Sequence, residues 1–216
     1  MEKFPDKLQK EILKIDQQIK PQLEQIDQQV LYNQMRVLEA FRKNHVAEED
    51  FAGSTGYGYD DLGRDKLEAI YADYFQTEDA MVKPQLMSGT HAITTAFFAV
   101  LRPNDKLFYL TGMPYDTIQQ VIGLVGNEPG SLKDFQIDFA YQPLLKDGQP
   151  DFDQAAEKLK DPAIKMVALQ RSRGYALRKS FTVAQLKQMI EFVRQIRPDV
   201  VIFVDNCYGE FSEIHE

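Results

Sequence analysis

The stretch VVIFVDNCYGEF, residues 200–211, contains the strongest strand pattern in the sequence. Residues 200–204 are all β-branched or aromatic, which is typical of a strand buried in a parallel sheet. This strand presents the carboxylate of Asp205 at its carboxyl end. Because burying an unpaired charge is costly, we expect Asp205 to cap a loop, bind a metal or pair with a cationic ring nitrogen. The metal is the weakest of these options, since Glu210 and His215 share no recognised ligand spacing with Asp205.

Helical and extended patterns alternate upstream of this strand. Thr182 is a good N-cap for the helix that precedes it. The patterns predict helices at about residues 65–75, 90–101, 115–122, 152–159 and 182–196, and extended segments at 80–86, 106–109, 135–139 and 165–169. The alternation predicts an α/β fold with a mostly parallel sheet sandwiched by helices.

Residues 6–43 are predicted to form an N-terminal helical arm. Apolar residues recur there at spacings of three and four, namely Leu8, Ile12, Ile15, Ile19, Leu23, Ile26 and Val30. Pro21 is expected to kink or split this helix. The arm could dock on its own core or reach a partner subunit, and the sequence leaves both open. We therefore expect an arm over residues 1–45 and a large domain over residues 46–216.

Composition and charge exclude several classes of protein. The 216 residues carry a net charge of −8, which disfavours a general binder of nucleic acids or anionic membranes. There is no apolar run of the ~20 residues that a membrane span needs, and no apolar signal-peptide core at the N-terminus. One cysteine and three histidines disfavour a disulfide framework and a Cys/His zinc site. We expect a cytoplasmic protein without a metal.

Two further stretches could bind a ligand. In LMSGTHAITTAFF, residues 86–98, the small residues Ser88, Gly89 and Thr90 precede a helix whose free N–H groups suit a phosphate, although an ordinary capped helix would look the same. In LTGMPYDT, residues 110–117, Tyr115 follows a strand and could stack on a flat ligand or belong to the core. Neither the GxGxxG nor the GxxxxGK[ST] motif occurs.

These stretches together predict one ligand. A phosphate at residues 88–90, a planar ring at Tyr115 and a protonated nitrogen at Asp205 describe pyridoxal 5'-phosphate (PLP).

Three segments carry a family resemblance: GYGYDDLGRDKLEAIYADYFQTEDAMVKPQLMSGTHAI (residues 56–93), LRPNDKLFYLTGMPYDT (101–117) and VVIFVDNCYGEF (200–211). From about residue 30 onward the chain resembles the methionine gamma-lyase-like, or aluminium-resistance, family. This family is a branch of the PLP-dependent cystathionine-metabolism enzymes with the aminotransferase fold type I. The resemblance implies that Gly89 and Thr90 bind the phosphate, that Tyr115 stacks on the pyridine ring, and that Asp205 pairs with its nitrogen in catalysis.

The resemblance also implies a shared active site. Tyr59 and Arg64, in YDDLGR, look like the loop by which one subunit reaches the cofactor phosphate of its neighbour. An arginine there suits phosphate, which it can bind through two parallel hydrogen bonds. We therefore expect a homodimer or homotetramer.

A stretch after another apolar strand, LQRSRGYALRKS (residues 169–180), is expected to face the same site. Arg171, Ser172 and Arg173 are candidates for the ring hydroxyl or for a substrate carboxylate, or they are surface charges. The better-known gamma-lyases have a neutral, Asn-containing stretch here, so the resemblance is incomplete at this point.

The resemblance implies a PLP-dependent carbon–sulfur lyase that acts on a small sulfur amino acid, with cystathionine beta-lyase or methionine gamma-lyase type elimination. In this family the cofactor-bearing Schiff-base lysine lies beyond the aspartate, and a C-terminal domain follows. We therefore interpret the chain as an N-terminal portion, with a non-catalytic module of the same fold as the alternative. A third interpretation, Cys207 as a nucleophile, lacks a histidine nearby in sequence.

Overall fold

The computed structural model describes residues 4–55, 61–126 and 129–215. The chain forms two compact units. The first contains the described residues up to Lys83 together with Phe211–Ile214, and the second contains Pro84–Glu210 and His215. Residues 46–83 thus group with the arm by their contacts. The predicted division into an arm and a cofactor-binding domain concerns function and stays a prediction.

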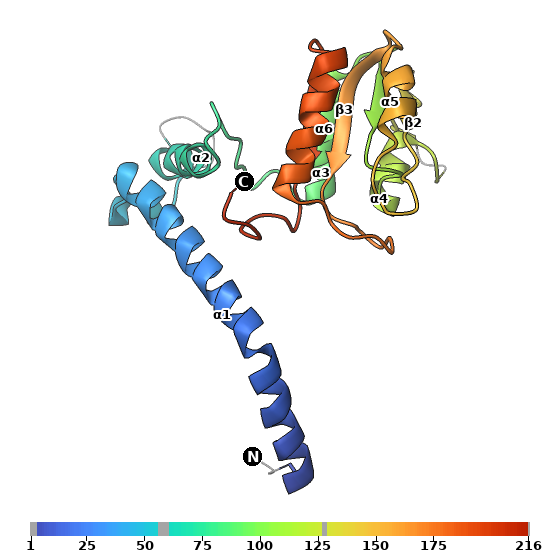
Figure 1. Cartoon of the computed structure of the whole chain (residues 1–216). Coiled ribbons are helices and arrows are strands. Elements are labelled where there is room, and N and C mark those ends of the chain that lie inside the picture. The colour runs from blue at the N-terminus through green and yellow to red at the C-terminus, as the bar shows by residue number, and fades with distance from the viewer. Residues whose placement is uncertain (1–3, 56–60, 127–128, 216) are drawn as a thin grey trace. The chain divides into compact units, whose positions relative to one another are not determined.

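The second unit is built on a parallel sheet (Figure 1). Its strands are β1 (Lys106–Tyr109), β2 (Asp138–Tyr141), β3 (Ile164–Gln170) and β4 (Val201–Asp205), in the order β2-β1-β3-β4. All three pairings are parallel, which confirms the predicted fold class. The strand order changes direction between β1 and β3, and parallel sheets commonly bind ligands beyond the carboxyl ends of strands at such a point.

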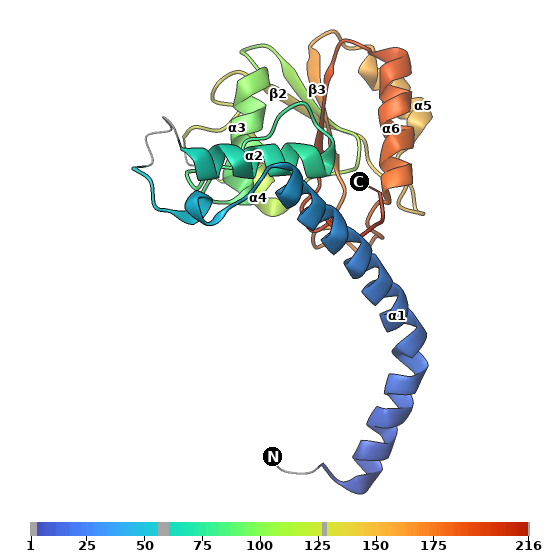
Figure 2. The ribbon, with the colours of Figure 1, turned by 90° about the vertical axis from the view of Figure 1, so that its left-hand side faces the viewer.

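Helices cover both faces of this sheet (Figure 2). One face packs against α3 (Gly89–Val100) and α4 (Asp116–Ile122), and the other against α5 (Phe152–Leu159) and α6 (Val183–Ile196). Successive residues of β1 serve opposite faces: Leu107 packs with the α3 and α4 side, and Phe108 with the α5 and α6 side. The apolar runs in the sequence follow from this double burial.

Two predicted extended segments differ in the structure. β2 begins at Asp138 rather than at residue 135, because Gln136 adopts a left-handed backbone (φ 59°) and belongs to a turn. Residues 80–86 form no strand among the described residues. The backbone N–H of Val82 donates to the carboxylate of Glu68 (2.9 Å) and not to the carbonyl of a neighbouring strand.

The first unit is helical and contains α1 (Asp6–Lys43), the short 3₁₀ helix η1 (Glu48–Phe51) and α2 (Leu62–Phe75). The hydroxyl of Tyr74 in α2 donates to the side chain of Asn33 in α1 (2.9 Å). Asn33 in turn donates to the carbonyl of Phe211 (3.1 Å), so the segment 211–214 closes onto the helix pair. No helix in the described part of the chain is long and apolar enough to cross a membrane.

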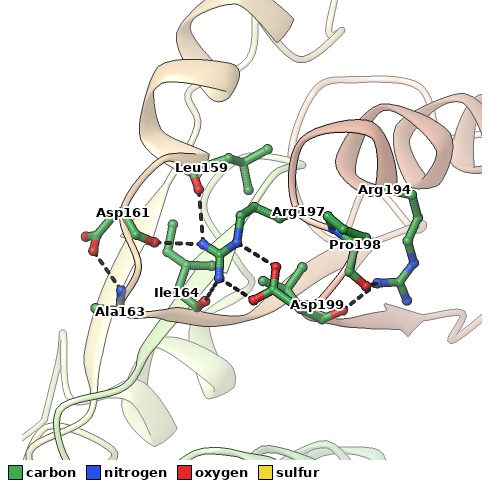
Figure 3. Close-up of polar contacts among 9 residues, drawn as sticks. Leu159, Asp161, Ala163, Ile164, Arg194, Arg197, Pro198 and Asp199 are labelled. Atoms are coloured by element: carbon green, nitrogen blue, oxygen red, sulfur yellow. Dashed lines mark hydrogen bonds and ion pairs between the residues drawn. The ribbon is translucent and has the colours of Figure 1, made fainter.

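Arg197, the residue after α6, holds the amino ends of β3 and β4 in place (Figure 3). Its guanidinium donates to the carbonyls of Leu159 (3.2 Å), Asp161 (2.9 Å) and Ile164 (3.0 Å). It also makes two 2.8 Å bonds to the carboxylate of Asp199, which lower the pKa of that group to about 2. One planar side chain therefore joins the end of α5, the start of β3 and the turn into β4.

We predict that Arg197→Met lowers the free energy of unfolding by about 2–4 kcal/mol, because it removes the guanidinium that donates to three backbone carbonyls. Urea denaturation monitored by circular dichroism measures this. Lys187→Met, on the exposed side of α6, is the control and should change stability by less than about 0.5 kcal/mol. Equal stability of the two variants would contradict the role assigned to Arg197.

Candidate functional site

A cavity of about 540 Å³ lies beyond the carboxyl end of the sheet in the second unit. It is lined by the starts of α3 and α4 and by the segments that follow β3 and β4. The residues predicted from sequence that line it are Ser88, Gly89, Thr90, Tyr115, Ser172, Arg173 and Asp205. The structure therefore brings together groups that are up to 117 positions apart in the chain.

Asp205 is the last residue of β4 and is only 6% exposed. Its carboxylate accepts a hydrogen bond from the backbone N–H of Cys207 (3.1 Å). Burial raises the pKa of Asp205, the bond from Cys207 opposes that rise, and the negative charge of Glu210 adds to it. Within the described residues no cation acts on this carboxylate, so Asp205 is a buried acid that a cationic ligand atom would stabilise.

A second buried polar group lies near Asp205. Tyr109, the last residue of β1, is fully buried, and its hydroxyl has no hydrogen-bond partner among the described residues. Burial raises the pKa of Tyr109 well above its ordinary value, and the charges of Asp205 and then of Tyr115 raise it further. Tyr109 and Asp205 end two strands that lie on either side of β3, and two buried polar groups short of partners there indicate a site for a polar ligand.

The start of α3 supplies hydrogen-bond donors. Ser88 is the N-cap, and its Oγ accepts from the N–H of His91 (3.1 Å). Gly89 and Thr90 occupy the first two helical positions, whose N–H groups have no acceptor within a helix. A Cβ at Gly89 would meet nothing within 4 Å, so the space beside this backbone is open. Such a helix start can bind a phosphate.

The start of α4 is tied to that of α3. Thr117 and Thr90 share a hydrogen bond between their hydroxyls (3.1 Å). Thr117 was not predicted from the sequence, where its position in the first turn of a helix is unremarkable.

Tyr115 combines the two roles that the sequence left open. It is the N-cap of α4, lines the cavity, and packs against the apolar cluster of the α3 and α4 face. Its backbone N–H donates to the side chain of Gln170 (3.3 Å), and Gln170 also donates to the carbonyl of Ser172 (3.1 Å). Gln170 was missed by sequence reasoning, because a buried glutamine at a strand end gives no signal until its partners are known.

Arg171 does not line the cavity. It is 3% exposed, and its guanidinium donates to the carbonyl of Phe181 (3.2 Å), the side chain of Asn206 (2.7 Å) and the carbonyl of Gly209 (3.0 Å). The geometry therefore gives no support to the expectation that Arg171 binds a substrate. It holds the segment after β4 in its turn.

Arg173 is exposed and lines the cavity, so a ligand in the cavity could reach its guanidinium. Arg178 stabilises this loop. Its guanidinium donates to the carbonyl of Ser172 (2.7 Å), and its Cζ lies over the ring of Phe181, 4.5 Å from the ring centroid.

The remaining predicted residues lie elsewhere. Arg64 belongs to the first unit, where it pairs with the buried carboxylate of Asp61 (3.0 Å). Tyr59 lies outside the described residues. Cys207 lines the cavity as an exposed free thiol whose pKa is raised, chiefly by burial, which disfavours the nucleophilic thiolate. In the described part of the chain, no group of three His, Cys, Asp or Glu residues could hold a metal ion.

These features fit a flat ligand with an anionic end and a cationic end. The α3 start suits the anion, Tyr115 the flat ring, and Asp205 the cation. The fold and the site therefore define a class: a parallel α/β protein with a ligand site beyond its strand ends, as in the aminotransferase-type PLP proteins.

Comparison with known proteins gives the family. The family model described as methionine gamma-lyase matches residues 8–216, and the chain belongs to this family. The protein YnbB of Bacillus subtilis (strain 168), described as uncharacterized, is 51% identical over 196 residues, which are 90% of this chain and 46% of that protein.

Two solved structures show the same fold. A Listeria monocytogenes protein named "putative cystathionine beta-lyase involved in aluminum resistance" is 50% identical, with a TM-score of 0.92 over 96% of this chain and 52% of its own. A carbon–sulfur lyase involved in aluminum resistance from Clostridium novyi NT is 39% identical, with a TM-score of 0.91 over 98% of this chain and 50% of its own. The chain spans about half the length of these relatives.

We predict that Asp205→Asn raises the unfolding temperature of the cofactor-free protein at neutral pH. The folded-state pKa of Asp205 is raised, so its charge costs stability above that pKa, and the cost disappears as the pH falls towards the ordinary value of 3.8. Thermal unfolding between pH 7 and pH 4 should show a gain for the variant that shrinks with falling pH. Asp116→Asn, at an exposed position of the same cavity, is the control. A loss of stability in Asp205→Asn at pH 7 would contradict the account.

Proposed function

We propose that the protein is a PLP-dependent carbon–sulfur lyase that acts on a sulfur amino acid. The membership of the methionine gamma-lyase family supports a lyase of this kind. The names of two similar structures support carbon–sulfur bond cleavage and suggest cystathionine as one substrate. Because the chain spans about half of these relatives, the activity proposed is that of the whole protein.

The observation that carries the proposal is the buried Asp205 carboxylate at the edge of the cavity. A carboxylate buried at a strand end with no cation from the described residues is stabilised by a protonated pyridine nitrogen. When bound, PLP supplies a protonated ring that withdraws electrons from the substrate's α-carbon. The role of Asp205 is to hold the proton on the ring nitrogen, and the N–H of Cys207 keeps the carboxylate in position.

The other cavity residues orient and bind. The N–H groups of Gly89 and Thr90 would hold the phosphate, with the hydroxyls of Ser88, Thr90 and Thr117 around it. Tyr115 would stack on the ring, and its backbone is fixed by Gln170. Because its backbone is fixed, the ring of Tyr115 would hold the pyridine ring in one orientation relative to Asp205. Reaction at a defined atom requires such a fixed orientation.

Arg173 is proposed to bind the substrate carboxylate, since it is an exposed guanidinium at the cavity. Tyr59 and Arg64 are proposed to reach the cofactor phosphate of a second subunit. A pair of subunits would then be the smallest active unit, and the whole assembly would be a homodimer or a homotetramer. A cytoplasmic location is part of the same proposal.

Asp205→Asn tests the function in the protein expressed from its intact gene. The variant should still bind PLP, because the phosphate and ring contacts remain, but its turnover should fall about 100-fold or more, because the ring nitrogen loses its anionic partner. Bound PLP is measured by absorbance after gel filtration, and turnover by release of α-keto acid from cystathionine and methionine.

Asp116→Asn is the matched control, since it removes one negative charge from the same cavity. It should keep turnover within about threefold of wild type, because Asp116 is an exposed residue at the start of α4 for which no contact with the cofactor is proposed. Wild-type turnover in Asp205→Asn would refute the proposed role. A wild-type protein that binds no PLP would favour the non-catalytic alternative.

Mixed dimers test the shared site. Subunits that carry Arg64→Ala and subunits that carry Asp205→Asn are each expected to be inactive alone. If Arg64 acts across the subunit boundary, a random mixture should recover about a quarter of wild-type activity, because half the dimers are mixed and each has one intact site. No recovery after confirmed subunit exchange would place Arg64 in its own subunit's site or in none.

A further inference from the structure

The exposed apolar face of α1 carries an inference that is independent of the lyase chemistry. Seven residues form a stripe along this helix: Leu8, Ile12, Ile15, Ile19, Leu23, Ile26 and Val30. Each is between 38% and 59% exposed. In the described part of α1 only Asn33 and Ala40 are buried, so the helix packs within its unit near its carboxyl end, beyond the stripe. A contiguous apolar face of this length indicates an interaction surface.

The stripe is symmetric about its centre. The spacings between successive members are 4, 3, 4, 4, 3 and 4, and they are the same in either direction from Ile19. The stripe also repeats after eleven residues (Leu8, Ile19 and Val30), a period close to three turns of an α-helix, so its members stay on one side of α1. At a rise of 1.5 Å per residue, it is about 33 Å long.

A symmetric stripe matches a second copy of itself in the antiparallel direction. A two-fold axis at Ile19 places Ile19 opposite Ile19, Ile15 opposite Leu23, and Ile12 opposite Ile26. Leu8 and Val30 then form the outermost layers. Every apolar layer of one copy therefore meets an apolar layer of the other, as an isologous two-fold interface requires.

The charges beside the stripe favour this direction. At 100° per residue, Asp16 and Lys20 lie on one flank of the stripe, and Glu11, Gln18 and Gln22 lie on the other. In an antiparallel two-fold pair each flank faces the same flank of the other copy. Asp16 then lies about 3 Å along the axis from Lys20 of the second copy, twice over by symmetry. Glu11 on the other flank faces glutamines rather than another acid.

A parallel pair would lack this complementarity. Each flank would then face the opposite flank, so Lys20 would lie between Gln18 and Gln22 of the second copy, and Asp16 would lie nearest to Gln18. Opposite charges on facing flanks set helix orientation in such pairs, and like charges oppose it.

We propose that two copies of this chain associate through an antiparallel pair of α1 helices whose two-fold axis passes at Ile19. The occupant of the stripe that we propose is thus a second α1.

Cysteine cross-linking tests the proposal in the protein expressed from its intact gene, in a Cys207→Ser background. Ile19→Cys should give a disulfide-linked dimer on mild oxidation, because the two thiols meet at the axis. Ile12→Cys alone should give about tenfold less, because its two copies lie at opposite ends of the pair. An equal mixture of Ile12→Cys and Ile26→Cys should cross-link again. The stripe is exposed in α1, so these changes leave the fold of the unit intact.

Other outcomes would overturn the proposal. Cross-linking of Ile12→Cys alone, as readily as of Ile19→Cys, would mean a parallel pair. Absence of the Ile19→Cys dimer would mean that something other than a second α1 covers the stripe. Cross-linking by random collision is excluded by a matched pair of variants in the Ile19→Cys background, in which Ile12→Asp with Ile26→Asp should abolish the dimer.

The control is Leu13→Asp with Leu31→Asp, at positions that are each 62% exposed on α1 but lie off the stripe. This change should leave the cross-link intact. If both double variants cross-link like the parent, the stripe is not the contact and the proposal fails.

Discussion

The parallel pairing of β3 with β4 is the constraint on which the candidate site depends. It aligns Gln170 with Asp205, and the N–H of Arg171 donates to the carbonyl of Asp205 (3.0 Å), so the ladder continues one residue beyond β3. Two side chains then act in opposite directions. Gln170 reaches the backbone of Tyr115, while Arg171 holds Asn206 and Gly209. The positions of Tyr115 and of Asp205 therefore both follow from one strand pair.

The energetic consequence of this arrangement is an acid that burial holds at a raised pKa. Such a group costs stability in the absence of a ligand, and a cationic ligand atom would offset that cost on binding. The same reasoning distinguishes Asp205 from Asp199 at the opposite end of β4. Asp199 is exposed and paired with Arg197, its pKa is lowered, and it serves only the fold. The carboxylates near the two ends of β4 thus differ in environment, because Asp205 alone of the two lacks a cation among the described residues.

The sequence predicted the fold class and half of the residues that line the cavity, because strand and helix ends follow from local patterns. Asp205, Tyr115 and the Ser88–Thr90 turn were found in this way, since parallel strands bring their carboxyl ends to one edge. Gln170 and Thr117 were not found, because their roles are hydrogen bonds between segments far apart in the chain.

Arg171 could not be distinguished from Arg173 in the sequence for a related reason. Whether an arginine serves the fold depends on its burial and on its hydrogen-bond partners. Neither can be read from the stretch Arg171–Ser172–Arg173. The late start of β2 follows from the positive φ of Gln136. This backbone conformation is usually adopted by glycine, so a glutamine at this position gave no sign of a turn. The palindromic spacing on α1, by contrast, can be seen in the sequence alone, but it gains meaning only once the structure shows that the stripe is exposed.

The most direct test of the central claim is the protonation state of the ring nitrogen of bound PLP. It can be measured by NMR with PLP that is labelled with ¹⁵N at that position and added to the protein expressed from its intact gene. If the ring nitrogen faces the Asp205 carboxylate, its ¹⁵N shift should remain that of the protonated form at pH values well above those at which free PLP loses this proton. A shift typical of neutral pyridine at those pH values would show that Asp205 does not hold the ring and would contradict the account.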